Sequence, residues 1–315
     1  MKYSKGQAVM NTQPIEIPFP VRQHPDRSRI ETSTRDWAAR FGLVDGDDAK
    51  RNLAAARFGE YAAYTHPAAP WPEAGITADW LTWAFLIDDQ YEDGELATAD
   101  TWREIIAAVT DVLAARPPSG PFADAPLIAA LADLTTRLYA LASPAWQKRF
   151  TSHFAAMVAG ALREIELRHA GIAPMRADYV ELRRDAGAMR VVFDIMEICI
   201  RAELSDEVYR DPLYQEIIES GADVVTWTND LHSAAKELSA GMVTNMVLVL
   251  HHHEGMDLPR AAEATRNLVA LRVADLDIAV RRLGDGHPAR RCAEAVCDWV
   301  AGSNSWHAAG TDRYR

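Results

Sequence analysis

Apolar residues follow a helical spacing along almost the whole chain. From Asp36 onward, apolar side chains recur every three or four positions among Ala, Leu, Arg and Glu residues, which favour helices. No series of alternating strands and no repeat of fixed period is found. Proline and glycine interrupt the pattern at intervals, at Pro67, Pro70, Pro72, Pro117, Pro118, Gly120, Pro121, Gly171, Pro174, Gly255, Pro259, Gly284, Gly286 and Pro288. The pattern predicts roughly ten helices with short connections, packed as one all-α domain.

The first 20 residues differ from this pattern. They are mainly polar, contain three prolines and lack the apolar stretch of a signal peptide. We therefore expect residues 1–20 to form a flexible leader and residues 21–315 to form the domain. No apolar run reaches the roughly 18–20 residues of a membrane-spanning helix.

Composition and charge limit the classes of partner. The 315 residues include 33 Lys and Arg against 45 Asp and Glu, which gives a formal net charge of −12. This balance argues against nucleic-acid binding and against docking on anionic membranes. The three cysteines, Cys199, Cys292 and Cys297, form no CxxC pair, so a reducing cytoplasm is expected. An anionic ligand would need positive charge supplied locally.

One stretch, WLTWAFLIDDQYED from Trp80 to Asp93, passes from apolar residues directly to four acids, Asp88, Asp89, Glu92 and Asp93. On a helix, acids four positions apart share a face and repel one another. A solvated acidic helix end is the alternative reading. An acid cluster at the end of a hydrophobic helix also suits Mg²⁺, which binds through one or two carboxylates together with phosphates.

A second polar pattern lies in WTNDLHSAAKEL, from Trp227 to Leu238. Asn229, Ser233 and Glu237 are spaced four residues apart, so on a helix they drift by only about 80° in total and point the same way. They offer three oxygen ligands with a single negative charge, which suits a Mg²⁺ that also binds phosphate oxygens. Lys236 lies beside them and can meet a phosphate as a point charge. A polar helix face with local hydrogen bonds is the alternative.

Together these motifs resemble those of the bacterial class I terpene cyclases. DDQYED resembles the family's aspartate-rich motif, whose usual spacing favours Asp93 over Glu92 as its third acid. NDLHSAAKE resembles the Asn/Ser/Glu triad of the family. Its diphosphate-sensing Arg is expected about 46 residues before the triad, at Arg183, with Ala186 as linker and Gly187 as effector residue. The closing Arg313-Tyr314 matches the family's C-terminal Arg-Tyr pair.

The resemblance implies a helical bundle of the class I terpenoid synthase type, with the active-site cavity in its core. It implies an isoprenyl diphosphate substrate and three Mg²⁺ ions. Asp88 would hold two ions and the Asn229, Ser233 and Glu237 triad the third, while Asp93 would anchor a basic partner on closure. Diphosphate oxygens would bind Arg183, Lys236, Arg313 and Tyr314. A homodimer is common among similar enzymes.

Ionisation of an isoprenyl diphosphate leaves an allylic carbocation. This cation requires a dry cavity lined by aromatic rings, which stabilise cations without reacting. Phe85, one turn before Asp88, and Trp299 and Trp306 near the C-terminus are the candidates, with ordinary core packing as the alternative. Tyr61, Tyr64 and Trp71 receive no assignment. The terminal base would be the bound diphosphate or the Gly187 carbonyl. Arg184 is expected to pair with Asp185 or Glu181, and the histidines at 251–253 to form a solvated helix end.

Three classes of function remain open at this stage. Farnesyl diphosphate is the expected substrate, and geranyl and geranylgeranyl diphosphate are the alternatives. A chain-elongating prenyl diphosphate synthase would share the metals but carry a second Asp-rich motif in place of the Asn/Ser/Glu triad. A non-enzymatic helical scaffold is the remote alternative and leaves the four spaced motifs unexplained.

Overall fold

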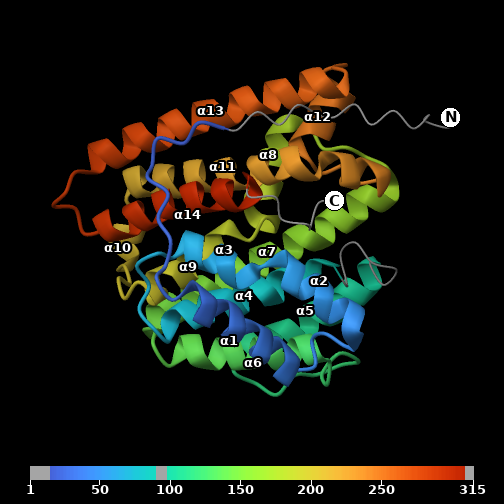
Figure 1. The fold of residues 1–315 in the computed structure, drawn as a ribbon. Helices are drawn as coiled ribbons and strands as arrows, with labels where there is room; N and C mark the ends of the chain where they lie inside the picture. Colours follow the sequence, from blue (N-terminus) through green and yellow to red (C-terminus); the bar gives the residue numbers. More distant parts are fainter. Residues whose placement is uncertain (1–14, 90–97, 309–315) are drawn as a thin grey trace.

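The computed structural model describes residues 15–89 and 98–308, and over these ranges its regular secondary structure consists of helices (Figure 1). Its fourteen helices are α1 (Arg27–Arg40), α2 (Gly46–Ala56), α3 (Phe58–Thr65), α4 (Glu73–Ile87), α5 (Ala99–Leu113), α6 (Pro126–Tyr139), α7 (Pro144–Ala170), α8 (Arg176–Ala186), α9 (Met189–Cys199), α10 (Asp206–Tyr209), α11 (Pro212–Ser239), α12 (Met246–His253), α13 (Leu258–Leu283) and α14 (Arg290–Ala308). The all-α single domain is confirmed. The expected count of roughly ten was too low, because α1 already begins at Arg27 and short helices such as α3 and α10 stand between the longer ones.

Side-chain caps fix where the long helices begin. The Asp211 carboxylate accepts hydrogen bonds from Leu213 N at 2.8 Å and Tyr214 N at 3.2 Å, and Pro212 opens α11. Ser143 and Pro144 begin α7 in the same way, and that helix ends at Gly171, which is left-handed with φ 63°. These caps set the first residues of α7 and α11.

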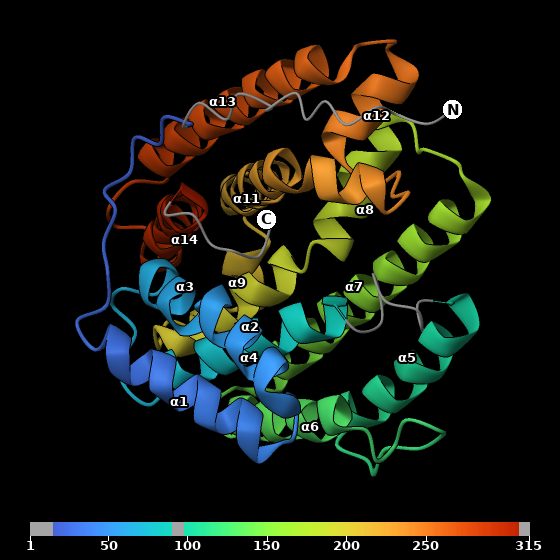
Figure 2. The same ribbon diagram turned by 45° about the vertical axis from the view of Figure 1, so that its right-hand side comes forward.

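The helices form two groups with α7 and α9 between them. In Figure 2, α11, α13 and α14 lie in the upper part, and α1, α5 and α6 lie in the lower part. Helix α3 packs against α1, α4 and α14 and so joins the groups on one side, while α7 contacts α5, α8 and α9 on the other. Helix α4 is buried along most of its length, which explains why its apolar residues surround the whole helix instead of forming one stripe.

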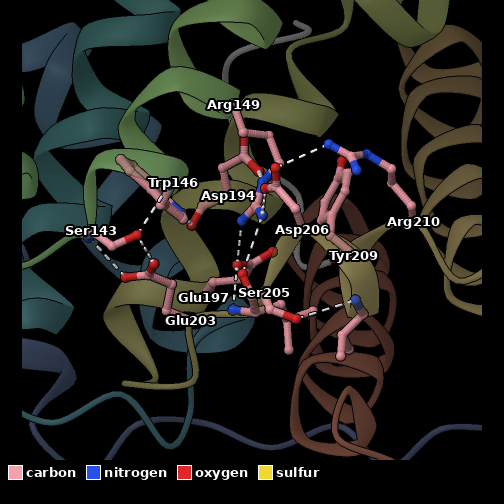
Figure 3. A network of polar contacts seen from close by, with 12 residues as sticks. Ser143, Trp146, Arg149, Asp194, Glu197, Glu203, Ser205, Asp206, Tyr209 and Arg210 are labelled. Atoms are coloured by element: carbon pink, nitrogen blue, oxygen red, sulfur yellow. Dashed lines mark hydrogen bonds and ion pairs between the residues drawn. The ribbon is translucent and has the colours of Figure 1, made fainter.

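A buried ionic network ties α7 to α9 (Figure 3). Arg149 Nε donates to Asp194 Oδ1 at 3.0 Å, and its Nη2 donates to Glu197. Both carboxylates are fully buried, and burial raises the pKa of Glu197 to about 8. Because a buried carboxylate is costly unless paired, this network fixes α9 against α7.

The chain from Ile15 packs on the bundle. Ile15 is buried, Ile17 and Phe19 contact the hydrophobic core, and Asn304 Nδ2 donates to the Ile15 carbonyl at 3.3 Å. Arg22 forms a two-point ion pair with Asp298 of α14, at 2.9 and 2.7 Å. Ile15, Ile17 and Phe19, which lie within the expected leader, therefore pack on the core. No helix among the described residues is long and apolar enough to cross a membrane.

Candidate active site

A single cavity in the bundle gathers most of the residues that the sequence singles out. Its lining includes Asp88, Arg183, Gly187, Asn229, Ser233, Lys236, Glu237, Phe85 and Trp299. These residues come from α4, α8, α11 and α14 and from the junctions that follow α4 and α8. Motifs almost 220 residues apart in the chain therefore meet in one place. Asp93, Arg313 and Tyr314, together with Glu92, lie outside the described residues.

Helix α4 delivers the first acid to the cavity mouth. Asp88 is the C-cap residue of α4, and Trp80, Leu81, Ala84 and Phe85 line the cavity on the turns before it. The apolar part of the helix thus forms the wall, and its acidic end forms the rim. Of the two acids that the structure describes here, Asp88 is half-buried and lines the cavity, whereas Asp89 is exposed.

Helix α11 delivers the triad. Asn229, Ser233 and Glu237 all face the cavity, as their spacing predicts, and Ser233 Oγ donates to the Asn229 carbonyl at 2.9 Å. Burial raises the pKa of the Glu237 carboxyl, and the nearby Asp230 charge raises it further. Lys236 also lines the cavity.

Arg183 faces the triad from α8. Its Nη2 lies 2.9 Å from Asp230 Oδ1 and donates to Asn229 Oδ1 at 3.1 Å. Asp230 is fully buried and also accepts hydrogen bonds from the Tyr179 hydroxyl and from Met246 N. The sequence analysis did not identify Asp230, although it stands directly beside Asn229.

A second arginine fixes α8 against α11. Arg184 donates from Nε and Nη2 to the two oxygens of Asp223, both at 2.9 Å, and Arg272 of α13 donates to the same carboxylate at 2.9 Å. The expected partner Glu181 is also bound, at 3.0 Å, whereas Asp185 pairs with Arg190 instead. Arg184 therefore helps to fix the position of α8, which carries Arg183, relative to α11, which carries the triad.

The junction between α8 and α9 approaches α11 closely. Gly187 ends α8, and a Cβ atom placed there would lie 2.6 Å from both the Arg183 carbonyl oxygen and Thr226 Cγ2. Ala188 follows with a left-handed φ of 61° and precedes α9. No side chain fits at position 187, so only the backbone of this residue can face the cavity.

Aromatic rings form the deeper wall. Phe85 stacks on Phe58 with ring centroids 4.7 Å apart, and Trp299 packs edge-on against Tyr61. Trp306, the other tryptophan expected on the wall, stacks on Tyr61 at 4.3 Å and is not among the residues that line the cavity. Four aromatic lining residues were not singled out from the sequence, because residue type alone does not distinguish them from core residues: Trp80, Trp83, Trp102 and His307. Burial lowers the pKa of His307 to about 3, so the imidazole is neutral.

Besides Asp88 and Glu237, the cavity is lined by a third acid, Glu164. Burial raises the pKa of Glu164 on α7 to about 8, and Glu237, Asp230 and Asp88 add to the rise against the lowering by Arg183. Glu164 was missed because it lies mid-helix with no motif spacing around it. Within the described ranges no three His, Cys, Asp or Glu side chains gather as a metal site. A divalent cation bound here would need neutral oxygen donors beside the acids. Asn229 and Ser233 line the same cavity and would add an amide and a hydroxyl oxygen, which gives an all-oxygen set of the kind Mg²⁺ prefers.

Comparison with known proteins decides the family. Residues 79–275 match the model of terpene synthase family 2, C-terminal metal binding. The chain is a class I terpene synthase. The synthase is 31% identical to pristinol synthase of Streptomyces pristinaespiralis over 99% of its own length and 87% of the relative's. It is 30% identical to (−)-delta-cadinene synthase of Streptomyces clavuligerus, over 97% of each chain.

Solved structures agree with this assignment. Wild-type cucumene synthase superposes on the synthase with a TM-score of 0.82 at 29% identity, covering 94% of this chain and 100% of the other. Linalool/nerolidol synthase from Streptomyces clavuligerus gives a TM-score of 0.81 at 26% identity, with 93% and 99% covered. The fold class expected from the sequence is thereby confirmed, and the synthase is a lyase that acts on diphosphates.

Proposed function

We propose that this synthase is a Mg²⁺-dependent cyclase that converts farnesyl diphosphate to a sesquiterpene hydrocarbon or alcohol and releases diphosphate. The observation that carries the proposal is the meeting of Asp88, Arg183 and the Asn229, Ser233 and Glu237 triad at the rim of an aromatic-lined cavity. The choice of a C15 substrate is supported by relatives. One of them, 31% identical over 82% of this chain, is a (+)-T-muurolol synthase from Roseiflexus castenholzii whose name specifies cyclisation of (2E,6E)-farnesyl diphosphate.

The rim residues would bind the diphosphate end of the substrate. Asp88 would hold two Mg²⁺ ions and the triad a third, and bound Mg²⁺ supplies positive charge that stabilises the departing diphosphate. Arg183 and Lys236 add fixed positive charge from the protein, and Arg313 and Tyr314 are proposed to join them. Asp93 is proposed to anchor a basic partner on closure. This arrangement lets a chain of net charge −12 bind a polyanion.

The wall residues would handle the hydrocarbon end. When the allylic C–O bond breaks, both electrons leave with the diphosphate oxygen, and a carbocation remains. The ring faces of Phe85, Trp299, Tyr61 and Trp80 can stabilise positive charge without reacting with it, and they exclude water. The cation finally loses a proton or captures a water molecule. Released diphosphate or the Gly187 carbonyl would accept the proton, and neither needs a strongly basic side chain.

Product analysis separates the possible substrates. The purified protein is incubated with Mg²⁺ and geranyl, farnesyl or geranylgeranyl diphosphate, and the volatiles are identified by gas chromatography. A cyclic C15 product as the dominant outcome supports the proposal. Cyclic products mainly from the C10 or C20 substrate would reassign the chain length, and longer diphosphates formed with added isopentenyl diphosphate would indicate chain elongation instead.

A further inference from the structure

Asn245 connects α11, which carries the triad, to the start of α12. It is fully buried, it precedes α12 as the N-cap residue, and it is not among the lining residues. Its Oδ1 accepts a hydrogen bond from Val247 N at 2.9 Å. Its Nδ2 donates to Glu237 Oε2 at 2.9 Å and to the Asp230 carbonyl at 3.0 Å, and lies 3.4 Å from Ser233 Oγ.

The cap determines which end of the amide faces the triad. A backbone N–H can only donate, so the atom of Asn245 that meets Val247 N must be the oxygen. The NH₂ group then points to α11, where its two hydrogens match the Glu237 carboxylate and the Asp230 carbonyl. The orientation therefore follows from hydrogen-bond chemistry.

Glu237 needs such a support because of its place in the helix. It lies in the last turn of α11, which ends at Ser239, and a helix end holds its side chains less firmly than the middle does. The chain that follows holds it twice: Met242 N donates to the Glu237 carbonyl at 2.9 Å, and Asn245 donates to its carboxylate. Asn245 thus engages Oε2 of a carboxylate whose residue lines the cavity.

We propose that Asn245 is a positioning residue of the metal site, which orients Glu237, and through it the triad, for cation binding. This inference rests on the proposed function, because it assigns the triad as metal ligands. Partners that hold metal ligands in this way typically change metal affinity or activity by about 10- to 100-fold when they are lost.

A purely structural role for Asn245, as the cap of α12, can be separated from this one. In Asn245→Ser the hydroxyl still caps the helix, because Ser and Asn are nearly equal as N-caps, but the shorter side chain has no amide to donate to Glu237. Asn245→Ala loses both functions. Asp257→Ser is the matched control, since Asp257 caps α13 through Arg260 N at 2.9 Å and does not line the cavity.

The experiment measures metal binding without turnover. Melting temperature is followed while Mg²⁺ is titrated at a fixed excess of inorganic diphosphate. We expect Asn245→Ser to melt close to the wild type without ligands and to need about 10-fold more Mg²⁺ or higher for half of the stabilisation. We expect Asp257→Ser to leave the Mg²⁺ requirement unchanged. Asn245→Thr, which also keeps a capping hydroxyl, replaces the Ser variant if that protein does not fold.

Two results separate failure of this inference from failure of the proposed function. If Asn245→Ser and the wild type need the same Mg²⁺ concentration, Asn245 is only a helix cap. If the wild type itself shows no Mg²⁺-dependent stabilisation with diphosphate, the metal site is wrong, and the role of Asn245 falls with it.

Discussion

Arg183 Nη2 lies between Asp230 Oδ1, at 2.9 Å, and Asn229 Oδ1, at 3.1 Å. The arginine proposed to bind diphosphate is thus hydrogen-bonded to the amide oxygen proposed as a metal ligand, with a buried carboxylate behind it. Binding of a cation to Asn229 would take over that oxygen and leave the same guanidinium hydrogen for the diphosphate. If the proposed function holds, we therefore expect metal binding and diphosphate binding to be coupled through Arg183.

Replacing Arg183 by Lys tests this relationship. A lysine keeps the positive charge but cannot meet Asp230, Asn229 and a diphosphate oxygen from one planar group. We expect diphosphate release to fall by about 100-fold or more, the scale for losing one preorganised donor at a site of developing charge. The control is Arg281→Lys, an exposed pair with Asp277 on α13. Equal turnover in the two variants would show that Arg183 has no part in diphosphate release.

The close approach at Gly187 predicts a strong effect of one methyl group. In Gly187→Ala, the new Cβ meets the Arg183 carbonyl and Thr226 Cγ2, so the α8–α9 junction must move. Overpacking of this kind costs about 1–3 kcal/mol, and we expect a melting temperature lower by a few degrees with at least a 10-fold loss of turnover. Gly286→Ala is the control, because nothing lies within 4 Å of a Cβ there. A Gly187→Ala protein with normal turnover would show that the junction is not part of the site.

Phe85 should control the product mixture more than the rate. Its ring lines the cavity next to Asp88, so Phe85→Leu removes an aromatic face while the metal ligands stay in place. We expect a changed ratio of volatiles by gas chromatography with diphosphate release within about 10-fold of the wild type. Phe150→Leu removes a buried ring that stacks on Trp146 and does not line the cavity. If both variants keep the wild-type product ratio, Phe85 is an ordinary core residue.

Glu164 predicts how stability of the metal-free protein depends on pH. Its pKa in the folded protein is about 8, above the ordinary 4.5, so folding favours the protonated form. Its contribution is complete below about pH 4.5 and is lost as the pH rises through about 8. Glu164→Gln keeps the shape without titrating, and we expect it to become more stable than the wild type by at least about 1 kcal/mol, or roughly 2 °C, at pH 8.5. Thermal melts at pH 5.5 and 8.5 measure this difference, which should shrink at the lower pH. A constant difference at both values would contradict the assignment.

The features of the site that residue spacing predicts are those that lie within a single helix. The positions of Asn229, Ser233 and Glu237 on α11 follow from helix geometry alone, and Asp88 ends α4 as the apolar-to-acidic transition indicates. Trp299 and Trp306 show the limit. They are seven residues apart and share a face of α14, and both pack against Tyr61 of α3, yet only Trp299 lines the cavity.

The residues that sequence analysis missed depend on contacts between helices. Glu164 belongs to no acidic motif of α7, where its nearest acidic neighbour is Glu166, and it lines the cavity on a helix that packs beside α8. Asn245 carries an ordinary capping signal, and its contact with Glu237 arises from the turn that folds α12 back onto α11. Such contacts depend on tertiary packing, which residue spacing does not encode.

The most direct test of the account is the Mg²⁺-dependent release of diphosphate from farnesyl diphosphate, measured together with the volatile product. The wild type should release one diphosphate for each cyclic C15 molecule formed, and chelation of Mg²⁺ should stop both. Asp88→Ala and Glu237→Ala should lower both to near background, because each removes a metal ligand. Full activity in either variant, or turnover of the wild type that persists without divalent metal, would contradict the central claim.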